Sequence, residues 1–83
     1  LLLGQTTACE KVARFLIDIA ARFRGETVAL PMGRQDMADY LGLTMETISR
    51  MLGRLQSDGL VEFSGARTYR IRRLGALSEM AGA

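Results

Sequence analysis

The chain has 83 residues, with 11 basic and 9 acidic side chains and a formal net charge of +2 at pH 7. A chain of this length forms one small domain that buries roughly 60% of the surface its unfolded state exposes, which leaves no room for a deep catalytic pocket. It has one cysteine, Cys9, and no histidine, which excludes an internal disulfide and a metal or iron–sulfur site built from several cysteines.

The first residues, LLLG, are too short for the apolar core of a signal peptide. No apolar run approaches the roughly 18 residues of a membrane span. We therefore expect a soluble, cytoplasmic protein without a membrane partner. We interpret residues 1–5 as the remnant of a preceding helix and residues 6–83 as one domain.

The first predicted element is an amphipathic helix that Thr6 or Thr7 caps and that continues to about Phe23. Its apolar residues recur at intervals of three and four positions, as expected for a helix with one buried face. They are Val12, Phe15, Leu16, Ile19, Ala20 and Phe23. The outer face carries an i,i+4 row of alternating charge, which we interpret as a solvated face. This row consists of Glu10, Arg14, Asp18 and Arg22.

A short β-branched run, TVALP, follows Gly25, which ends this helix. Pro31 cannot donate a main-chain hydrogen bond to a neighbouring strand. The run is therefore predicted to lie at the edge of a sheet.

The stretch from Arg34 to Gly59 has the spacing of a helix-turn-helix. A residue as small as Ala38 lets the two helices approach where they cross, and Gly42 supplies the positive φ that a three-residue turn needs. Ile48 fills the crossing. The intervening apolar positions are Met37, Leu41, Leu43 and Met51.

The second helix of this unit is predicted to start at Met45, because the hydroxyl group of Thr44 can accept from the free amides at Glu46 or Thr47. Glu46 also lies near the positive end of the helix dipole. A period of 3.6 residues divides the helix into two faces. The inward residues are Ile48, Met51, Leu52 and Leu55, and the outward residues are Met45, Glu46, Ser49, Arg50 and Gly53.

Three outward side chains have the chemistry that base edges in a DNA major groove require. Arg50 can donate to O6 and N7 of guanine, Glu46 can accept from N4 of cytosine, and Ser49 can do either. Recognition helices contact bases through their N-terminal residues, where these three lie. The alternative is that Glu46 and Arg50, four residues apart, form an ordinary surface ion pair worth roughly 0.3–0.5 kcal/mol.

After Gly59, the runs LVEFS and TYRIR alternate apolar and polar residues and flank the turn GAR, which predicts a β-hairpin with Gly65 in its turn. A helix-turn-helix followed by a hairpin is a winged helix, so the predicted fold is mainly α with a small β-hairpin wing (α+β). Arg67 lies near the hairpin tip, either as a contact to sugar-phosphate or as an ordinary exposed residue. Tyr69 is expected in the core, and a short C-terminal helix is expected after Arg73.

The segment YLGLTMETISRMLGRLQSDGLVEF closely resembles the DNA-binding signature of the Crp-Fnr superfamily of bacterial transcription regulators, and the resemblance extends over essentially the whole chain. Glu46, Ser49 and Arg50 match the E-x-x-S-R arrangement of the family. The flanking LPMGRQDMADYLGLT is most similar to the Fnr and FixK branch. Met45 and Ser49 stand where the cyclic-AMP-receptor branch has arginine and glycine, which argues against the TGTGA-type target of that branch.

The resemblance implies a C-terminal DNA-binding domain of a dimeric activator that reads TTGA-like half-sites of an inverted repeat, with Glu46, Ser49 and Arg50 on the bases. It implies phosphate contacts at Arg34, Gln35, Thr44, Thr47, Ser64 and Arg67. The family would supply an N-terminal sensory β-barrel and a long helix for homodimerisation, of which Leu1 to Leu3 would be the end. RNA polymerase is implied as a further partner through the loop from Arg24 to Thr27.

Other functions stay open at this point. A winged helix can serve as a protein-interaction module, with the arginines as the partner surface. An enzyme is a remote alternative, because the chain has no histidine and its single cysteine lies on a predicted helix, so that nothing pairs a nucleophile with a base. Cys9 is interpreted as a small half-buried residue, with a redox-active thiol as the alternative. No cofactor or metal is expected in this chain. The resemblance implies that an iron–sulfur cluster of the Fnr type would lie in the N-terminal sensory part, outside these 83 residues.

Overall fold

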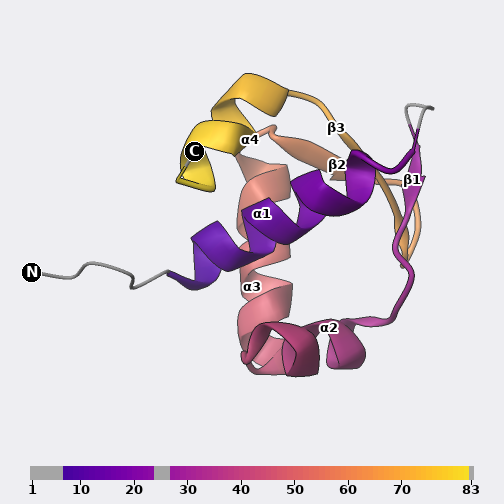
Figure 1. The fold of residues 1–83 in the computed structure, drawn as a ribbon, viewed down its shortest axis with the longest axis vertical. Coiled ribbons are helices and arrows are strands. Elements are labelled where there is room, and N and C mark those ends of the chain that lie inside the picture. Colours follow the sequence, from indigo (N-terminus) through magenta and orange to yellow (C-terminus); the bar gives the residue numbers. More distant parts are fainter. Residues whose placement is uncertain (1–6, 24–26, 83) are drawn as a thin grey trace, which may run out of the picture.

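The computed structural model describes residues 7–23 and 27–82, in which four helices and one small antiparallel sheet form the fold (Figure 1). The helices are α1 (Ala8–Ala20), α2 (Arg34–Leu41), α3 (Met45–Ser57) and α4 (Leu74–Met80), and the strands are β1 (Val28–Ala29), β2 (Val61–Phe63) and β3 (Thr68–Ile71). These elements confirm the predicted winged helix-turn-helix of the α+β class. The interpretation of residues 1–5, the helix end at Gly25 and most of the loop from Arg24 to Thr27 lie outside the described residues.

Helix α1 begins with a reciprocal cap. The hydroxyl oxygen of Thr7 accepts from the amide of Glu10 at 3.1 Å, and Oε1 of Glu10 accepts from the amide of Thr7 at 2.8 Å. The bond from the Thr7 amide lowers the pKa of the Glu10 carboxyl, because it favours the charged form, and the Thr7 side chain adds to this effect. The cap at Thr7 was one of the two predicted; the role of Glu10 was missed, although threonine followed three residues later by glutamate is the sequence signal for it.

The end of α1 differs from the prediction. The helix stops at Ala20, not near Phe23, and the chain continues in a tighter turn. In this turn the amide of Arg22 donates to the carbonyl of Ile19 at 3.1 Å and that of Phe23 to the carbonyl of Ala20 at 3.0 Å. Phe23 consequently leaves the buried face and is 43% exposed. The outer charged row is exposed as predicted at Arg14 and Asp18, which form a surface ion pair of 3.9 Å.

The turn between α2 and α3 has the predicted geometry. Gly42 has a φ of 71°, and the amide of Leu43 donates to the carbonyl of Ala38 at 2.8 Å. A residue with a side chain would be strained in this left-handed conformation by roughly 1–2 kcal/mol. Ala38 and Ile48 are fully buried at the crossing of the two helices. The sequence spacing therefore reports a real steric constraint.

Helix α3 ends in a second left-handed turn that directs the chain into the wing. Gly59 has a φ of 74°, its amide donates to the carbonyl of Gln56, and the amide of Leu60 donates to the carbonyl of Leu55 at 3.0 Å. Leu55 and Leu60 are both buried. Such paired bonds with an apolar contact are a common way to close a helix at a glycine.

The three strands form one sheet in the order β1-β3-β2. Strands β2 and β3 are the predicted hairpin, with Val61 opposite Ile71 and Phe63 opposite Tyr69. Strand β1 pairs with the other side of β3, with Val28 opposite Tyr69. Its edge position agrees with the prediction from Pro31, whereas its joining the hairpin was not predicted.

The core lies between α1, α3 and the sheet, with α4 packed against α1 (Figure 1). Tyr69 is fully buried, as predicted, and its hydroxyl group donates to the carbonyl of Leu16 at 2.6 Å. This bond ties the middle of the sheet to the middle of α1. Within the described residues, no helix is long and apolar enough to cross a membrane.

Burial of Tyr69 makes the stability of the fold pH-dependent in the alkaline range. Desolvation raises the pKa of the Tyr69 phenol well above its ordinary value of 10.0. The contribution of the protonated Tyr69 phenol to the free energy of unfolding is therefore fully present below about pH 10. It is lost as pH rises further, because the tyrosine of the unfolded state releases its proton first. In urea unfolding, we expect the free energy of unfolding to fall above pH 10 with a slope approaching 1.4 kcal/mol per pH unit.

The matched variants are Tyr69→Phe and Tyr40→Phe, since Tyr40 is 70% exposed. Tyr69→Phe should remove this component of the pH profile, while Tyr40→Phe should retain it. Parallel profiles for wild type and Tyr69→Phe above pH 10 would contradict the assignment.

Candidate nucleic-acid interface

Helix α3 presents the predicted triplet to solvent. Glu46, Ser49 and Arg50 are exposed, whereas Ile48 and Leu52 on the opposite face are buried. Within the described residues no ion pair joins Glu46 to Arg50, although they are four positions apart. The carboxylate and the guanidinium therefore remain available to a ligand, and the ordinary-ion-pair interpretation receives no support from the geometry.

Two threonines form the start of α3. The hydroxyl oxygen of Thr44 accepts from the amide of Thr47 at 3.1 Å, and the Thr44 hydroxyl group lies 2.9 Å from that of Thr47. The predicted cap and the predicted start at Met45 are thus confirmed. Thr44 is exposed and Thr47 half-buried, so the hydroxyl groups border the same helix end as the triplet. Glu46 occupies the first turn, where the helix dipole favours a negative charge.

Arg34 and Gln35 begin α2 and differ in their surroundings. Arg34 is half-buried, and its guanidinium carbon lies 5.6 Å from the centre of the Phe63 ring. Gln35 is exposed, and its amide nitrogen donates to the carboxylate of Asp39 at 3.2 Å. The start of α2 is therefore next to the wing, a neighbourhood that the sequence pattern did not indicate.

The tip of the wing contains the other two candidate phosphate ligands. The amide of Ser64 donates to the carbonyl of Thr68 at 2.9 Å, and their hydroxyl groups lie 3.2 Å apart, which closes the turn. Arg67 is exposed, but its Nη2 donates to the carbonyl of Leu30 at 3.3 Å. Arg67 is thereby held toward the segment after β1.

The wing is fastened to α3 by a contact that sequence reasoning missed. The amide of Phe63 donates to Oε1 of Gln56 at 3.2 Å. The Phe63 ring stacks on Tyr69, with 5.3 Å between ring centres and 28° between planes. No local signal marks Gln56, because its partner lies in the following strand.

The arginines of the second half of the chain differ in how far they are neutralised. Arg70 forms an ion pair with Glu62 at 2.9 Å, and Arg54 one with Asp58 at 3.9 Å. Arg50, by contrast, has no hydrogen-bond or ion-pair partner among residues 7–23 and 27–82. The unneutralised positive charge on the outward face of α3 is therefore at Arg50.

Met45 is an outward residue to which the sequence interpretation gave no role. It is the first residue of α3 and is 48% exposed. An apolar side chain of this kind at the start of a recognition helix can contact the methyl group of thymine. Its exposure next to the polar triplet is the signal that marks it.

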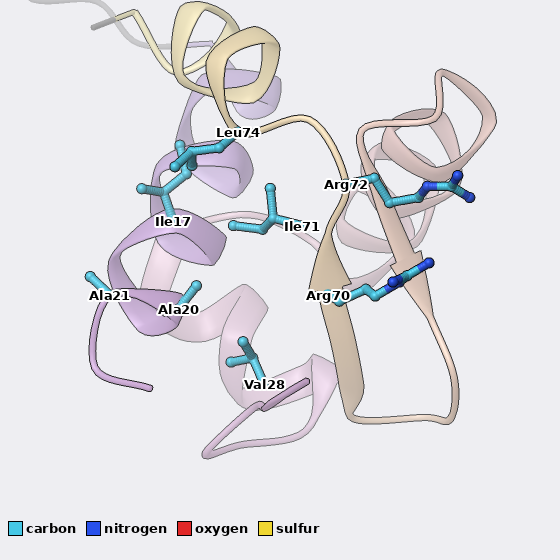
Figure 2. A pocket seen from close by; sticks show the side chains of 8 residues that line it. All are labelled: Ile17, Ala20, Ala21, Val28, Arg70, Ile71, Arg72 and Leu74. Carbon is cyan, nitrogen blue, oxygen red and sulfur yellow. The ribbon is translucent and has the colours of Figure 1, made fainter. Parts of the chain in front are cut away.

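A cavity of about 590 Å³ lies on another side of the molecule, between α1, β1, β3 and the start of α4 (Figure 2). Its aliphatic lining consists of Ile17, Ala20, Ala21, Val28, Ile71 and Leu74. The side chains of Arg70 and Arg72 point away from these residues (Figure 2). The lining therefore pairs no nucleophile with a base.

Cys9 is half-buried against the core, as predicted. Burial raises the pKa of its thiol, which lowers the fraction of reactive thiolate. This environment favours the interpretation as a packing residue. No group of three or more potential metal ligands occurs among the described residues.

Comparison with known proteins agrees with this geometry. A family model described as a Crp-like helix-turn-helix domain matches residues 10–80. The nitrogen fixation regulation protein FixK of Rhizobium meliloti is 43% identical over 81 residues, which cover 96% of this chain and 38% of that protein. The transcriptional activatory protein AadR of Rhodopseudomonas palustris is 48% identical over 85 residues, covering 94% and 36%.

Among solved structures, FixK2 from Bradyrhizobium japonicum superposes with a TM-score of 0.90 and 46% identity, covering 100% of this chain and 42% of that one. The chain thus spans less than half the length of these relatives.

The threonine cap of α3 can be tested without DNA. Thr44→Val keeps the branched shape but loses the oxygen that accepts from Thr47, so we expect the free energy of unfolding to fall by about 1 kcal/mol. Thr44→Ser keeps the acceptor and should stay near wild type. Thermal unfolding should show a difference of roughly 4–8 °C between the two variants. Equal melting temperatures would mean that the cap contributes no stability.

Proposed function

This chain belongs to the Crp-Fnr family of transcription regulators as a DNA-binding domain, and we propose that it reads TTGA-like half-sites of an inverted repeat through α3. The observation that carries the proposal is the exposed triplet of Glu46, Ser49 and Arg50, which has no internal ion pair between Glu46 and Arg50 in the described part of the chain. The domain binds DNA without a cofactor or metal of its own.

The proposed base contacts follow from hydrogen-bonding capacity. Arg50 donates to O6 and N7 of the guanine in the half-site, and Glu46 accepts from N4 of the paired cytosine. Ser49 contacts a neighbouring base edge as donor or acceptor. Met45, which is exposed beside them, contacts a thymine methyl group.

The proposed phosphate contacts surround this base-reading surface. They are Arg34, Gln35, Thr44, Thr47, Ser64 and Arg67. Contacts of this kind fix the register of the protein on the duplex without reading sequence. The support for them is that all are exposed or half-buried and lie at the start of α2, at the start of α3 or in the wing.

The whole protein is proposed to act as a homodimeric transcription activator in the bacterial cytoplasm. A helix N-terminal to this domain joins the two copies, and two-fold symmetry places the two α3 helices in major grooves about 34 Å apart. RNA polymerase is the proposed protein partner. A single domain, lacking the second copy, binds one half-site weakly.

The base-reading role of Arg50 is tested by Arg50→Ala. On a duplex that contains TTGA we expect a loss of roughly 1–3 kcal/mol and relaxed discrimination at the guanine position. The control is Arg14→Ala, which removes the same charge from the exposed outer face of α1; α1 packs on the inward side of α3. Fluorescence anisotropy with the TTGA duplex and with its single-base variants measures both the loss of affinity and the discrimination at the guanine position. A uniform loss on all sequences would make Arg50 a phosphate contact.

A salt titration separates DNA binding from the alternative of a protein-interaction module. Two arginines that neutralise phosphates give a slope of roughly −2 in a plot of log K against log salt concentration for one domain. We expect this slope on the TTGA duplex, with weaker binding to a scrambled duplex at every salt concentration. Absence of both the slope and the preference would favour the protein-interaction module.

A further inference from the structure

Phe63 lies where the wing, the end of α3 and the start of α2 contact one another. It is the last residue of β2 and immediately precedes Ser64 at the wing tip. Its amide contacts Gln56 near the end of α3, and its ring contacts both Tyr69 in the sheet and Arg34 at the start of α2. One half-buried residue thus contacts, through its amide and its ring, elements that are separate in the sequence.

The ring of Phe63 is held on the side that faces the core. It stacks on Tyr69 with ring centres 5.3 Å apart. Tyr69 is itself fully buried and bonded to the carbonyl of Leu16. The hydrogen bond from the Phe63 amide to Gln56 fixes the main chain at the same residue. Phe63 is therefore a rigid part of the fold, although it lies next to an exposed turn.

The Phe63 ring also contacts Arg34, whose guanidinium carbon lies over the ring, 5.6 Å from its centre. A guanidinium over an aromatic face is attracted by the electron-rich centre of the ring. Its N–H groups lie in its own plane and remain able to donate to an anion. The contact consequently restricts the motion of Arg34 before any ligand arrives, without occupying all of its donors.

We propose that Phe63 is a positioning residue for DNA binding, which holds Arg34 and the wing tip in one fixed arrangement so that both meet the sugar-phosphate backbone together. The inference rests on the proposed function, because it assigns Arg34 and Ser64 to phosphates. It extends that function by naming a residue that contacts no DNA and still sets affinity. Since phosphate contacts are independent of sequence, Phe63 acts on affinity and leaves base discrimination unchanged.

The contact with Arg34 is tested first in the DNA-free chain. Phe63→Leu keeps an apolar side chain and removes the ring, whereas Phe63→Tyr keeps the ring. In NMR spectra, the side-chain Nε–H of Arg34 should shift and become more mobile in Phe63→Leu and stay near its wild-type position in Phe63→Tyr. Unchanged Arg34 resonances in Phe63→Leu would overturn the proposal, whatever the DNA results.

The consequence for binding is tested by a double-mutant cycle with Arg34→Ala on TTGA and scrambled duplexes. Phe63→Leu alone should weaken binding by roughly two- to fivefold on both duplexes, the scale of an exposed cation–π contact. In the Arg34→Ala background the same change should have almost no further effect, because the residue it positions is gone. An equal loss in both backgrounds would overturn the proposal.

A wing variant away from Arg34 controls for simple loss of stability. Ile71→Val shortens a half-buried residue of β3 that lines the cavity of Figure 2. It should lower the melting temperature and leave DNA affinity within twofold of wild type. A loss of DNA affinity in Ile71→Val as large as that in Phe63→Leu would count against a positioning role of Phe63.

Failure of the proposed function can be told apart from failure of this inference. If the wild-type chain shows neither salt dependence nor sequence preference in DNA binding, the proposed function fails. The Arg34 resonances separately report whether Phe63 holds the Arg34 side chain.

Discussion

The hydrogen bond from Tyr69 to the carbonyl of Leu16 joins the two halves of this fold. On one side of it lies the helical core, and on the other a sheet whose strands are only two to four residues long. Strands this short have little stability of their own. A fully buried aromatic ring in the central strand attaches them to α1 and supplies the surface on which Phe63 stacks. Together with the hydrogen bond from the Phe63 amide to Gln56, this buried residue sets the position of the wing.

Helix α3 has two faces with different roles: one face is buried in the core and the opposite face is exposed. Ile48, Leu52 and Leu55 are buried and fix the helix against α1 and α2, which leaves the opposite face rigid and exposed. A rigid helix face lets short side chains meet a groove with little loss of conformational freedom on binding. The left-handed turns at Gly42 and Gly59 lie at the two ends of this helix and change the direction of the chain there.

Features set by neighbouring residues were predictable from sequence, and features set by distant contacts were not. The turn at Gly42 and the cap at Thr44 each depend on a few adjacent positions. The end of α1 was placed too late, because the residues up to Phe23 are compatible with a helix and only the fold shows where it stops. Two features depend on contacts between distant segments: the pairing of β1 with β3, and the contacts of Phe63 with Gln56 and Arg34. The residue pattern of one segment does not indicate which distant segment it will contact.

Charge alone gives this chain little attraction for DNA. The net charge is +2, and Arg54 and Arg70 are paired with acidic side chains. Long-range steering by such a surface is weak at physiological ionic strength, where charges are screened within about 8 Å. For the proposed DNA-binding function, affinity would then depend more on a few cations held in the right place than on the net charge. Under the proposed function, the fixed position of Arg34 against the Phe63 ring, 5.6 Å from the ring centre, therefore matters more than the number of arginines.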